Sequence, residues 1–304
     1  MRLIFMGTPD FARESLRSIY SEGRHEVCAV FTQPDKPRDR GMKLSFSPVK
    51  ELALAHGTTV YQPKTLRDGE AAKIIRSLAP DVIVVVAYGK IIPKEIIDIP
   101  PKGCINVHGS LLPKYRGAAP IQWTILNGDR EAGVTTMFLS ERMDAGDIIS
   151  KRSVAVGEYE TSGELFERLK KLGAELLLET LRDIENGTAT RTKQDESEAT
   201  YVRQLSKKDS PIDWTHSSEQ IINKIRGLNP WPLATAEFGG KEFKIYAAIK
   251  TGRQTEKPAG EIVSSGKDGI ELACGDGKTI MITELQAPGK RRMKAADYLL
   301  GNRL

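Results

Sequence analysis

An asparagine and a histidine stand two positions apart at the end of a short apolar run, as Asn106 and His108. β-Branched Ile105 and Val107 favour a strand there, and strand residues alternate between faces, so both polar side chains point the same way. A carboxamide donates hydrogen bonds, and an imidazole donates or exchanges a proton. A lone strand histidine is more often a packed or surface residue. This pair, however, lies at the carboxyl end of its expected strand, and open parallel sheets bind ligands beyond the carboxyl ends of their strands.

A carboxylate is the third candidate, because Asp144 lies in the turn cluster 143–147 after the apolar run 134–139. If that run is a neighbouring strand, Asp144 can approach His108 across the end of the sheet. The alternative is a turn residue that binds its own backbone, which is the commoner role of an isolated turn aspartate.

The elements that must position these residues alternate along the chain. Thr8 and Ser47 suit helix N-caps because a proline follows each. The continuous β-branched run near 82–86 is typical of the centre of a parallel sheet. Strands are expected at 3–6, 27–32, from 60, 81–89, 104–108, 134–139 and 148–156, and helices at 8–20, 47–56, 68–78, 118–126 and 161–186. This order predicts an α/β fold with a Rossmann-like, mostly parallel sheet and helices on both faces.

The first turn, at 7–12, does not favour a dinucleotide. It lacks the G-x-G-x-x-G fingerprint, and Pro9 fills a position where that fingerprint relies on a flexible backbone. A nicotinamide-dependent oxidoreductase is therefore disfavoured.

The segment 33–48 contains three prolines and a glycine and shows no helical or strand period. Its cations Lys36, Arg38, Arg40 and Lys43 outnumber its two aspartates. We expect an exposed basic loop, which is either a solvated connection or a segment that meets an anionic partner.

The chain changes character after a polar stretch at 189–206, which we interpret as a linker between residues 1–188 and 207–304. A helix is expected at 218–227, followed by short alternating strands separated by glycine turns, which favour a small OB-like β-barrel. This second part carries 16 Lys and Arg against 12 Asp and Glu. A basic barrel of this kind suggests nucleic acid, although ordinary surface lysines would give a similar excess.

Composition indicates a globular protein with no membrane anchor. The chain has 304 residues, of which 39% are hydrophobic and 28% charged. No apolar run approaches a membrane span, and the start resembles no signal peptide, so we expect a cytoplasmic protein. The cysteines Cys28, Cys104 and Cys274 are far apart, so we expect neither a disulfide framework nor a metal site. Nothing in the sequence demands more than a monomer.

The run N-V-H-G-S-L-L-P-K-Y-R-G-A-A-P-I from Asn106 resembles the signature of the formyltetrahydrofolate-dependent formyltransferases. Further matches narrow the resemblance to the members that act on methionyl-tRNA, and they extend from end to end: G-T-P-D-F-A at 7–12, Q-P-D-K-P at 33–37, A-Y-G at 87–89, N-P-W-P at 229–232 and G-N-R-L at 301–304. One departure is the short segment 297–300 before the closing residues, where some members have a longer one.

This resemblance implies transfer of formyl from 10-formyltetrahydrofolate, without a metal, to the α-amine of methionyl initiator tRNA in translation initiation. It implies that 1–188 is the catalytic domain and that 207–304 binds tRNA. Asn106, His108 and Asp144 would form a catalytic trio, in which the first two can donate hydrogen bonds to the formyl oxygen. The implied folate contacts are Ser110, Leu111, Leu112 and Pro113, and we expect the loop with Tyr88, Gly89 and Ile91 to hold the pterin. The expected tRNA contacts are Arg38, Arg40, Lys43, Lys207 and Lys208.

Other functions remain open from the sequence. The amine could belong to a nucleotide-linked amino sugar or to a glycinamide ribotide, because these relatives share the N-x-H and aspartate site. The basic loop and the basic second part favour tRNA. A non-catalytic tRNA-binding protein is disfavoured by the intact trio.

Overall fold

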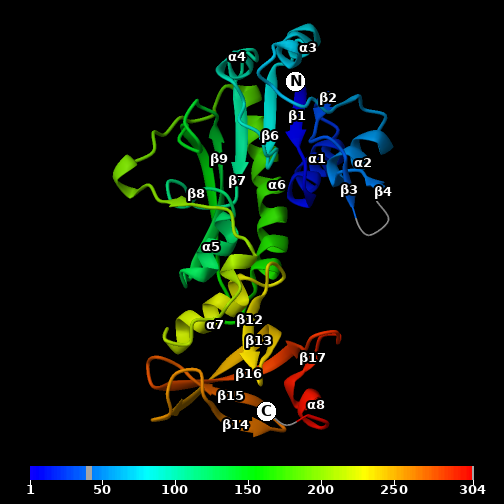
Figure 1. Ribbon diagram of the computed structural model, residues 1–304. Helices are drawn as coiled ribbons and strands as arrows, with labels where there is room; N and C mark the ends of the chain where they lie inside the picture. The colour runs from blue at the N-terminus through cyan, green and yellow to red at the C-terminus, as the bar shows by residue number, and fades with distance from the viewer. Residues whose placement is uncertain (39–42, 303–304) are drawn as a thin grey trace. The chain divides into compact units, whose positions relative to one another are not determined.

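The computed structural model describes residues 1–38 and 43–302 and divides the chain into two compact units (Figure 1). Unit 1 comprises Met1–Gly117, Gly133–Ser153 and Phe166–Tyr201, and unit 2 comprises Ala118–Ala132, Val154–Leu165 and Val202–Leu304. The chain therefore passes between the units several times before the C-terminal part begins. The domain boundaries at 188 and 206 stay predictions.

A seven-stranded sheet is the centre of unit 1. Its order is β10-β9-β7-β6-β1-β2-β5. The strands are β1 (Arg2–Gly7), β2 (Glu26–Phe31), β5 (Val60–Tyr61), β6 (Val82–Val86), β7 (Cys104–His108), β9 (Glu131–Phe138) and β10 (Ile148–Ala155). Strands β5, β2, β1, β6 and β7 pair in parallel, whereas β7 and β9 are antiparallel. The predicted, mostly parallel α/β sheet is thus confirmed.

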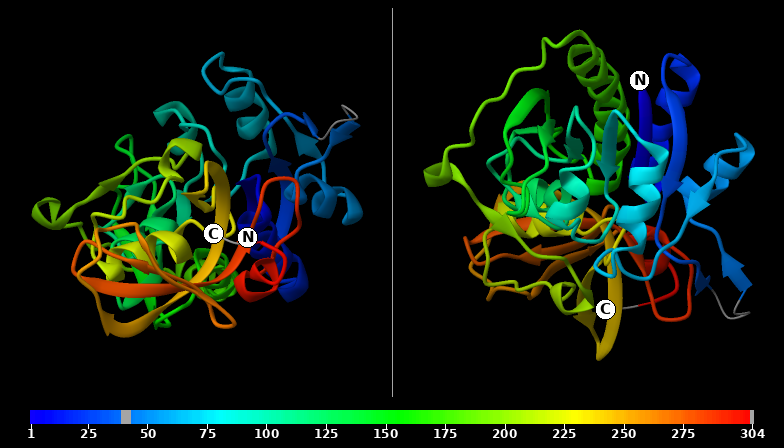
Figure 2. Two further views of the ribbon diagram at one scale, coloured as in Figure 1. Left: turned by 60° about the horizontal axis from the view of Figure 1, so that its bottom comes forward. Right: turned by 90° about the horizontal axis from the view of Figure 1, so that it is seen from above.

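Helices cover both faces of this sheet (Figure 2). They are α1 (Asp10–Glu22), α2 (Pro48–Ala55), α3 (Glu70–Leu78), α4 (Lys94–Ile97) and α6 (Ser162–Asn186). Ile4 and Met6 of β1 pack in one buried cluster with Ile75 of α3 and Ile96 of α4. On the other face, Gly173 brings α6 so close to β7 that an added Cβ would meet Val107 at 3.2 Å. Because Val107 faces α6, its neighbours in β7 face the side of α3 and α4.

Two predicted caps have different outcomes. Ser47 accepts a hydrogen bond from the backbone N–H of Lys50, so the cap of α2 is confirmed. The expected cap at Thr8 is wrong, because Pro9 occupies the N-cap position of α1. The Thr8 hydroxyl instead donates to the carbonyl of Tyr88 at 3.2 Å, a partner 80 residues away that local pattern does not reveal.

The segment 33–48 was expected to be a loop, but it contains a short antiparallel hairpin, β3 (Lys36–Arg38) and β4 (Lys43–Ser45). Strands of three residues are too short for alternation to appear in the sequence. The base of the hairpin is fixed by Gln62, whose Nε2 donates to the Gln33 carbonyl and the Asp35 carboxylate, each at 2.8 Å. Lys50 donates to the same carboxylate.

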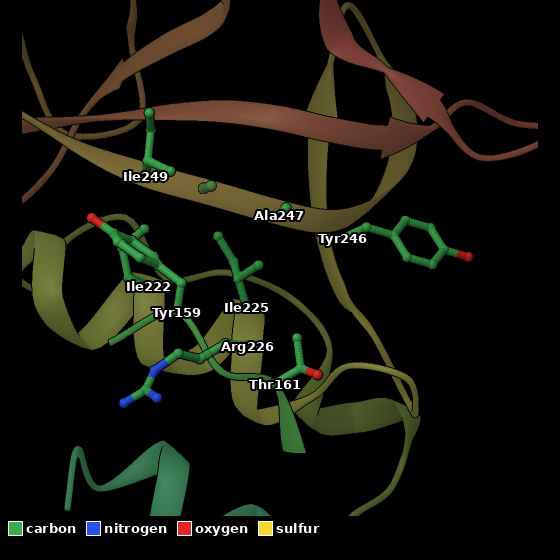
Figure 3. Close-up of a pocket in the computed structure, with 9 residues that line it drawn as sticks. Tyr159, Thr161, Ile222, Ile225, Arg226, Tyr246, Ala247 and Ile249 are labelled. Carbon is green, nitrogen blue, oxygen red and sulfur yellow. The ribbon is translucent and has the colours of Figure 1, made fainter. Parts of the chain in front are cut away.

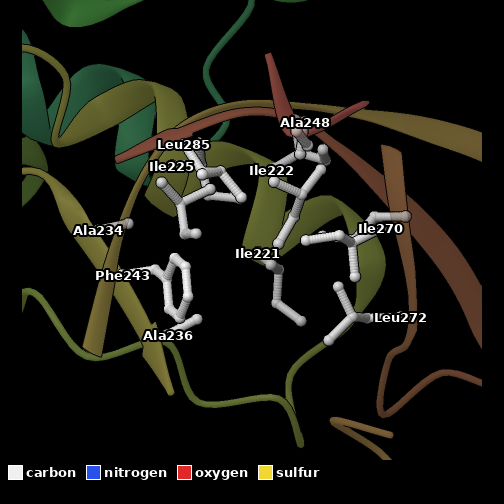
Figure 4. Packing of buried hydrophobic residues seen from close by; sticks show 14 of the residues in the cluster. Ile221, Ile222, Ile225, Ala234, Ala236, Phe243, Ala248, Ile270, Leu272 and Leu285 are labelled. Carbon is white, nitrogen blue, oxygen red and sulfur yellow. The ribbon is translucent and has the colours of Figure 1, made fainter. Parts of the chain in front are cut away.

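Unit 2 has a six-stranded antiparallel sheet, which agrees with the predicted β-rich second part. Its strands are β12 (Ala234–Phe238), β13 (Lys241–Gln254), β14 (Ile262–Gly266), β15 (Gly269–Ala273), β16 (Lys278–Gln286) and β17 (Met293–Lys294), and its helices are α5 (Pro120–Leu126), α7 (Ser218–Gly227) and α8 (Ala295–Leu299). Ile221, Ile222 and Ile225 of α7 point into a core with Phe243 of β13 and Leu285 of β16 (Figure 4). Among the described residues, no helix combines the length and apolar character needed to cross a bilayer.

Candidate active site

Strand β7 presents Asn106 and His108 on the same face, as its alternation requires. Their side chains are largely buried, with 9% and 6% of each residue exposed. Asn106 pairs with Val85 of β6 and with Met137 of β9, so β7 is held on both sides. The pair thus stands on a rigid strand rather than on a loop.

The imidazole of His108 is fixed by a backbone carbonyl. Its Nε2 lies 2.9 Å from the oxygen of Tyr115, and because a carbonyl only accepts, Nε2 carries the hydrogen. Its Nδ1 lies 3.8 Å from Oδ2 of Asp144. That separation is too long for a hydrogen bond.

The Asp144 carboxylate is held by the backbone N–H of Gly117, which donates to Oδ2 at 2.8 Å. Asp144 has φ 50°, a left-handed conformation that aspartate adopts more readily than most residues. Asp144 lies close to His108 as expected, but the expected reason, that their two strands end at the same edge of the sheet, is wrong. Strand β9 is antiparallel to β7, with His108 opposite Thr135, so its carboxyl end lies beside the start of β7. The loop 139–147 must therefore bring Asp144 back to His108.

The carboxamide of Asn106 forms no hydrogen bond within residues 1–38 and 43–302. Asn106 is 9% exposed, and its carboxamide is not among the described polar atoms that are both shut off from solvent and unpaired, so the amide stays open to a ligand. Together with the imidazole and the carboxylate, it supplies a hydrogen-bond donor, a proton carrier and a negative charge. Such a set can stabilise an oxygen that becomes negative during an acyl transfer.

The loop after β7, with the expected folate contacts, is tied to β9. Thr135 Oγ1 donates to the Ser110 carbonyl at 2.7 Å and accepts from the backbone N–H of Leu112 at 3.1 Å. The Leu112 side chain is fully buried with Met137. Leu111 packs on Gly133, where an added Cβ would lie 2.4 Å from its methyl group. The buried Leu112 side chain therefore anchors the loop, whereas the Leu111 side chain is only partly buried.

The three predicted folate contacts in the loop after β6 lie in different environments. The Tyr88 side chain is 2% exposed and belongs to the core beside α3 and α4, and burial raises the pKa of Tyr88 to about 12. Gly89 has φ 79°, which turns the chain outward. Ile91 follows with 64% of its surface exposed. Of these side chains, Ile91 is the one placed to meet a ligand.

Sequence reasoning missed a polar network around Arg116 of β8 (Arg116–Gly117). This arginine is fully buried, donates to Gln194 Oε1 at 2.8 and 3.1 Å, and donates to Glu196 at 2.9 Å. Gln194 and Glu196 lie in the stretch interpreted as a linker. No local feature of the sequence indicates this network, because the partners of Arg116 stand some 80 positions later.

The Glu196 carboxylate gives this network a pH dependence. Hydrogen bonds from Arg116 and then Arg142 lower the pKa of Glu196 from 4.5 to about 2. A carboxyl with a depressed pKa stabilises the fold above its unfolded pKa and loses that effect as the pH falls. We expect Glu196→Gln to have a lower melting temperature than wild type, with a constant difference from pH 7 to 5 that shrinks below about 4.5. Melting curves of both proteins from pH 7 to pH 3 test the expectation, and a difference in melting temperature that is unchanged at pH 3 would contradict it.

The predicted tRNA contacts are only partly described. Arg38 and Lys43 lie in β3 and β4, and Arg40 lies outside the described residues. Lys207 and Lys208 are exposed on the short 3₁₀ helix Lys207–Asp209.

A pocket in unit 2 does not contain any of these residues. It lies between α7 and β13 and is lined mainly by apolar side chains such as Ile222, Ile225 and Ile249 (Figure 3). Its Arg226 side chain points away from β13 and already donates to the carbonyls of Gly157 and Glu160. No group of histidines, cysteines and carboxylates suited to a metal occurs among the residues described.

Comparisons with known proteins show the family of this chain. The formyl transferase family model matches residues 1–181, and the formyl transferase C-terminal domain matches residues 204–303. The methionyl-tRNA formyltransferase of Lachnospira eligens is 48% identical over 309 residues, covering 100% of this chain and 98% of the relative. That of Clostridioides difficile is 47% identical, covering 99% and 97%.

Solved structures share the fold at lower identity. An N-formyltransferase from Helicobacter canadensis, in complex with folinic acid and dTDP-3-aminofucose, has a TM-score of 0.69 at 21% identity and covers 94% of this chain and 98% of that one. HypX from Aquifex aeolicus, in complex with tetrahydrofolic acid, has a TM-score of 0.64 at 20% identity and covers 98% of this chain, which spans 47% of HypX. From its two family domains and its full-length relatives, the chain belongs to the methionyl-tRNA formyltransferases of the formyl transferase family.

Proposed function

We propose that Asn106, His108 and Asp144 carry the reaction of this enzyme, the transfer of formyl from 10-formyltetrahydrofolate to the α-amine of methionyl initiator tRNA in translation initiation. The full-length relatives at 45–48% identity carry that activity in their names. The observation that supports the site is the Asn106 carboxamide, which has no hydrogen-bond partner among the described residues and stays open to a ligand, on the same strand as an imidazole that lies 3.8 Å from a carboxylate, all within unit 1.

The reaction forms a C–N bond between the amine and the formyl carbon and then breaks the bond between that carbon and N10 of the folate. Negative charge develops on the formyl oxygen, the amine loses a proton and N10 gains one. Asn106 donates a hydrogen bond to that oxygen. Because the Nε2–H of His108 is engaged by the Tyr115 carbonyl, Nδ1, which lies 3.8 Å from Oδ2 of Asp144, is the ring nitrogen left to take part in the proton transfers.

The folate and the tRNA would each contact a different set of residues. Ile91 and the half-buried Leu111 provide apolar surface for the folate, alongside the backbone of Gly89, Ser110 and Pro113. Arg38, Arg40, Lys43, Lys207 and Lys208 supply cations for tRNA phosphates. We further propose that the enzyme is a cytoplasmic monomer.

Formyl transfer by the wild type to three acceptors tests the function. We expect methionyl initiator tRNA to be formylated with a kcat/KM at least about a thousandfold above that of free methionine or a nucleotide-linked amino sugar, because tRNA offers many backbone phosphates to the basic residues, whereas free methionine has none and the amino sugar has only its diphosphate. Equal transfer to the amino sugar would move the enzyme to the small-amine branch of the family.

The basic hairpin has its own test. Removing two phosphate-binding cations, in Arg38→Ala with Lys43→Ala, is expected to raise the KM for tRNA about tenfold. The slope of the logarithm of this KM against the logarithm of the salt concentration should decrease by about two. The KM for the folate should not change. Lys73→Ala, which removes an exposed lysine from α3, is the control. An unchanged salt dependence of tRNA binding in the double variant would remove the hairpin from the interface.

A further inference from the structure

One glutamine holds the loop that carries Asp144. The Nε2 amide of Gln194 donates to the carbonyl of Asp144 and to the carbonyl of Gly146, each at 2.8 Å. Both hydrogens of a planar amide are thereby used on two carbonyls of the same turn. The turn is also closely packed, since an added Cβ on Gly146 would meet the carbonyl oxygen of Phe138 at 1.8 Å.

The other end of the Gln194 side chain is fixed by a buried charge. Its Oε1 accepts from Nε and from a terminal nitrogen of Arg116, at 3.1 and 2.8 Å. The backbone at Gln194 is held as well, because Thr192 exchanges two backbone hydrogen bonds with Ile148 at the start of β10. The amide therefore has little freedom to follow a movement of the Asp144 turn.

The residues on either side of Arg116 hold His108 and Asp144. The Tyr115 carbonyl accepts from His108, and the Gly117 N–H donates to the Asp144 carboxylate. This stretch is also bound by the segment that carries Gln194, since Thr200 accepts from the backbone N–H groups of Tyr115 and Arg116, each at 2.8 Å. The segment that carries Gln194 therefore binds both the Asp144 turn and the stretch 115–117, which itself holds His108 and Asp144.

Two residues of the network have backbones that need support. Tyr115 and Asp144 adopt left-handed φ values of 61° and 50°. Non-glycine residues keep such conformations only where the surrounding structure fixes them. For Asp144 this support comes from Gln194 at its carbonyl and Gly117 at its carboxylate.

We propose that Gln194 is a positioning residue that sets the place of the Asp144 carboxylate relative to His108. The inference rests on the catalytic role proposed for Asp144. A carboxylate on an unsupported turn would leave the 3.8 Å separation from His108 undefined, and a misplacement of about 1 Å is enough to lower a rate about a hundredfold.

Gln194→Glu is the sharpest test, because it keeps an oxygen acceptor for Arg116 and replaces the donating amide by a carboxylate oxygen that repels the two carbonyls. We expect kcat to fall about ten- to a hundredfold, with each KM changed less than about twofold. Gln220→Glu is the matched control, since that glutamine uses its oxygen to cap α7, which a glutamate also does. Gln194→Met, which is neutral, should lower kcat in the same direction. Melting curves identify any variant that has lost its fold.

A double variant separates positioning from general support. If Gln194 acts through Asp144, adding Gln194→Met to Asp144→Asn should lower kcat no further than Asp144→Asn does alone. Full additivity of the two losses, or a wild-type kcat in both Gln194 variants, would overturn the inference. If instead Asp144→Asn itself has a wild-type kcat, the proposed catalytic site fails, and the inference fails with it.

Discussion

Asn106→Ala is expected to lower kcat for formyl transfer by two to three orders of magnitude, which corresponds to about 3–4 kcal/mol of transition-state stabilisation. The reason is that the Asn106 carboxamide, with no partner among the described residues, is the donor most free to bind the developing oxyanion. The affinities for tRNA and folate should stay close to those of the wild type. Single-turnover formylation at saturating substrates measures the chemical step directly.

Asn106→Asp sharpens this expectation, since it keeps the size of the side chain and replaces the donor by an oxygen that repels the oxyanion. The fall in kcat for Asn106→Asp should be at least as large as that for Asn106→Ala. Asn186→Ala, at the exposed end of α6, is the control and should be silent. A kcat within about threefold of wild type in Asn106→Asp would exclude the amide from the oxyanion site.

The sequence predicts what depends on local period. The alternation of β7 places Asn106 and His108 on one face, and the proline after Ser47 marks a helix start that the structure confirms. It does not predict partners that are far apart in the chain. Thr8 gives its hydroxyl to Tyr88 instead of capping α1, although its type and position suit a cap.

The candidate site shows the same division. Asp144 comes close to His108, but β9 runs opposite to the direction that made this plausible, so the approach depends on the fold of the loop 139–147. Gln194 has no local feature that separates it from the polar residues around it. Its importance arises only when Arg116 and the Asp144 turn are folded against it, which is tertiary information.

Asp144→Asn is expected to lower kcat by two to three orders of magnitude without loss of the fold. The asparagine keeps an oxygen that accepts from the Gly117 N–H, so the change removes the negative charge and little else. Loss of a carboxylate that supports a catalytic imidazole has an effect of about this size or larger. Asp147→Asn, in the same loop and about a third exposed, is the control and should leave kcat within about threefold.

Combining this change with His108→Ala decides how the carboxylate acts. If Asp144 works only through the imidazole, it has no role once the ring is gone, and kcat of the double variant should fall no further than that of His108→Ala alone. If the two losses multiply, the carboxylate acts on the substrate amine itself. The 3.8 Å gap between Nδ1 and Oδ2, which is too long for a direct hydrogen bond, is what makes both outcomes physically possible. Retained tRNA binding in all three variants would show that the losses come from chemistry rather than from recognition.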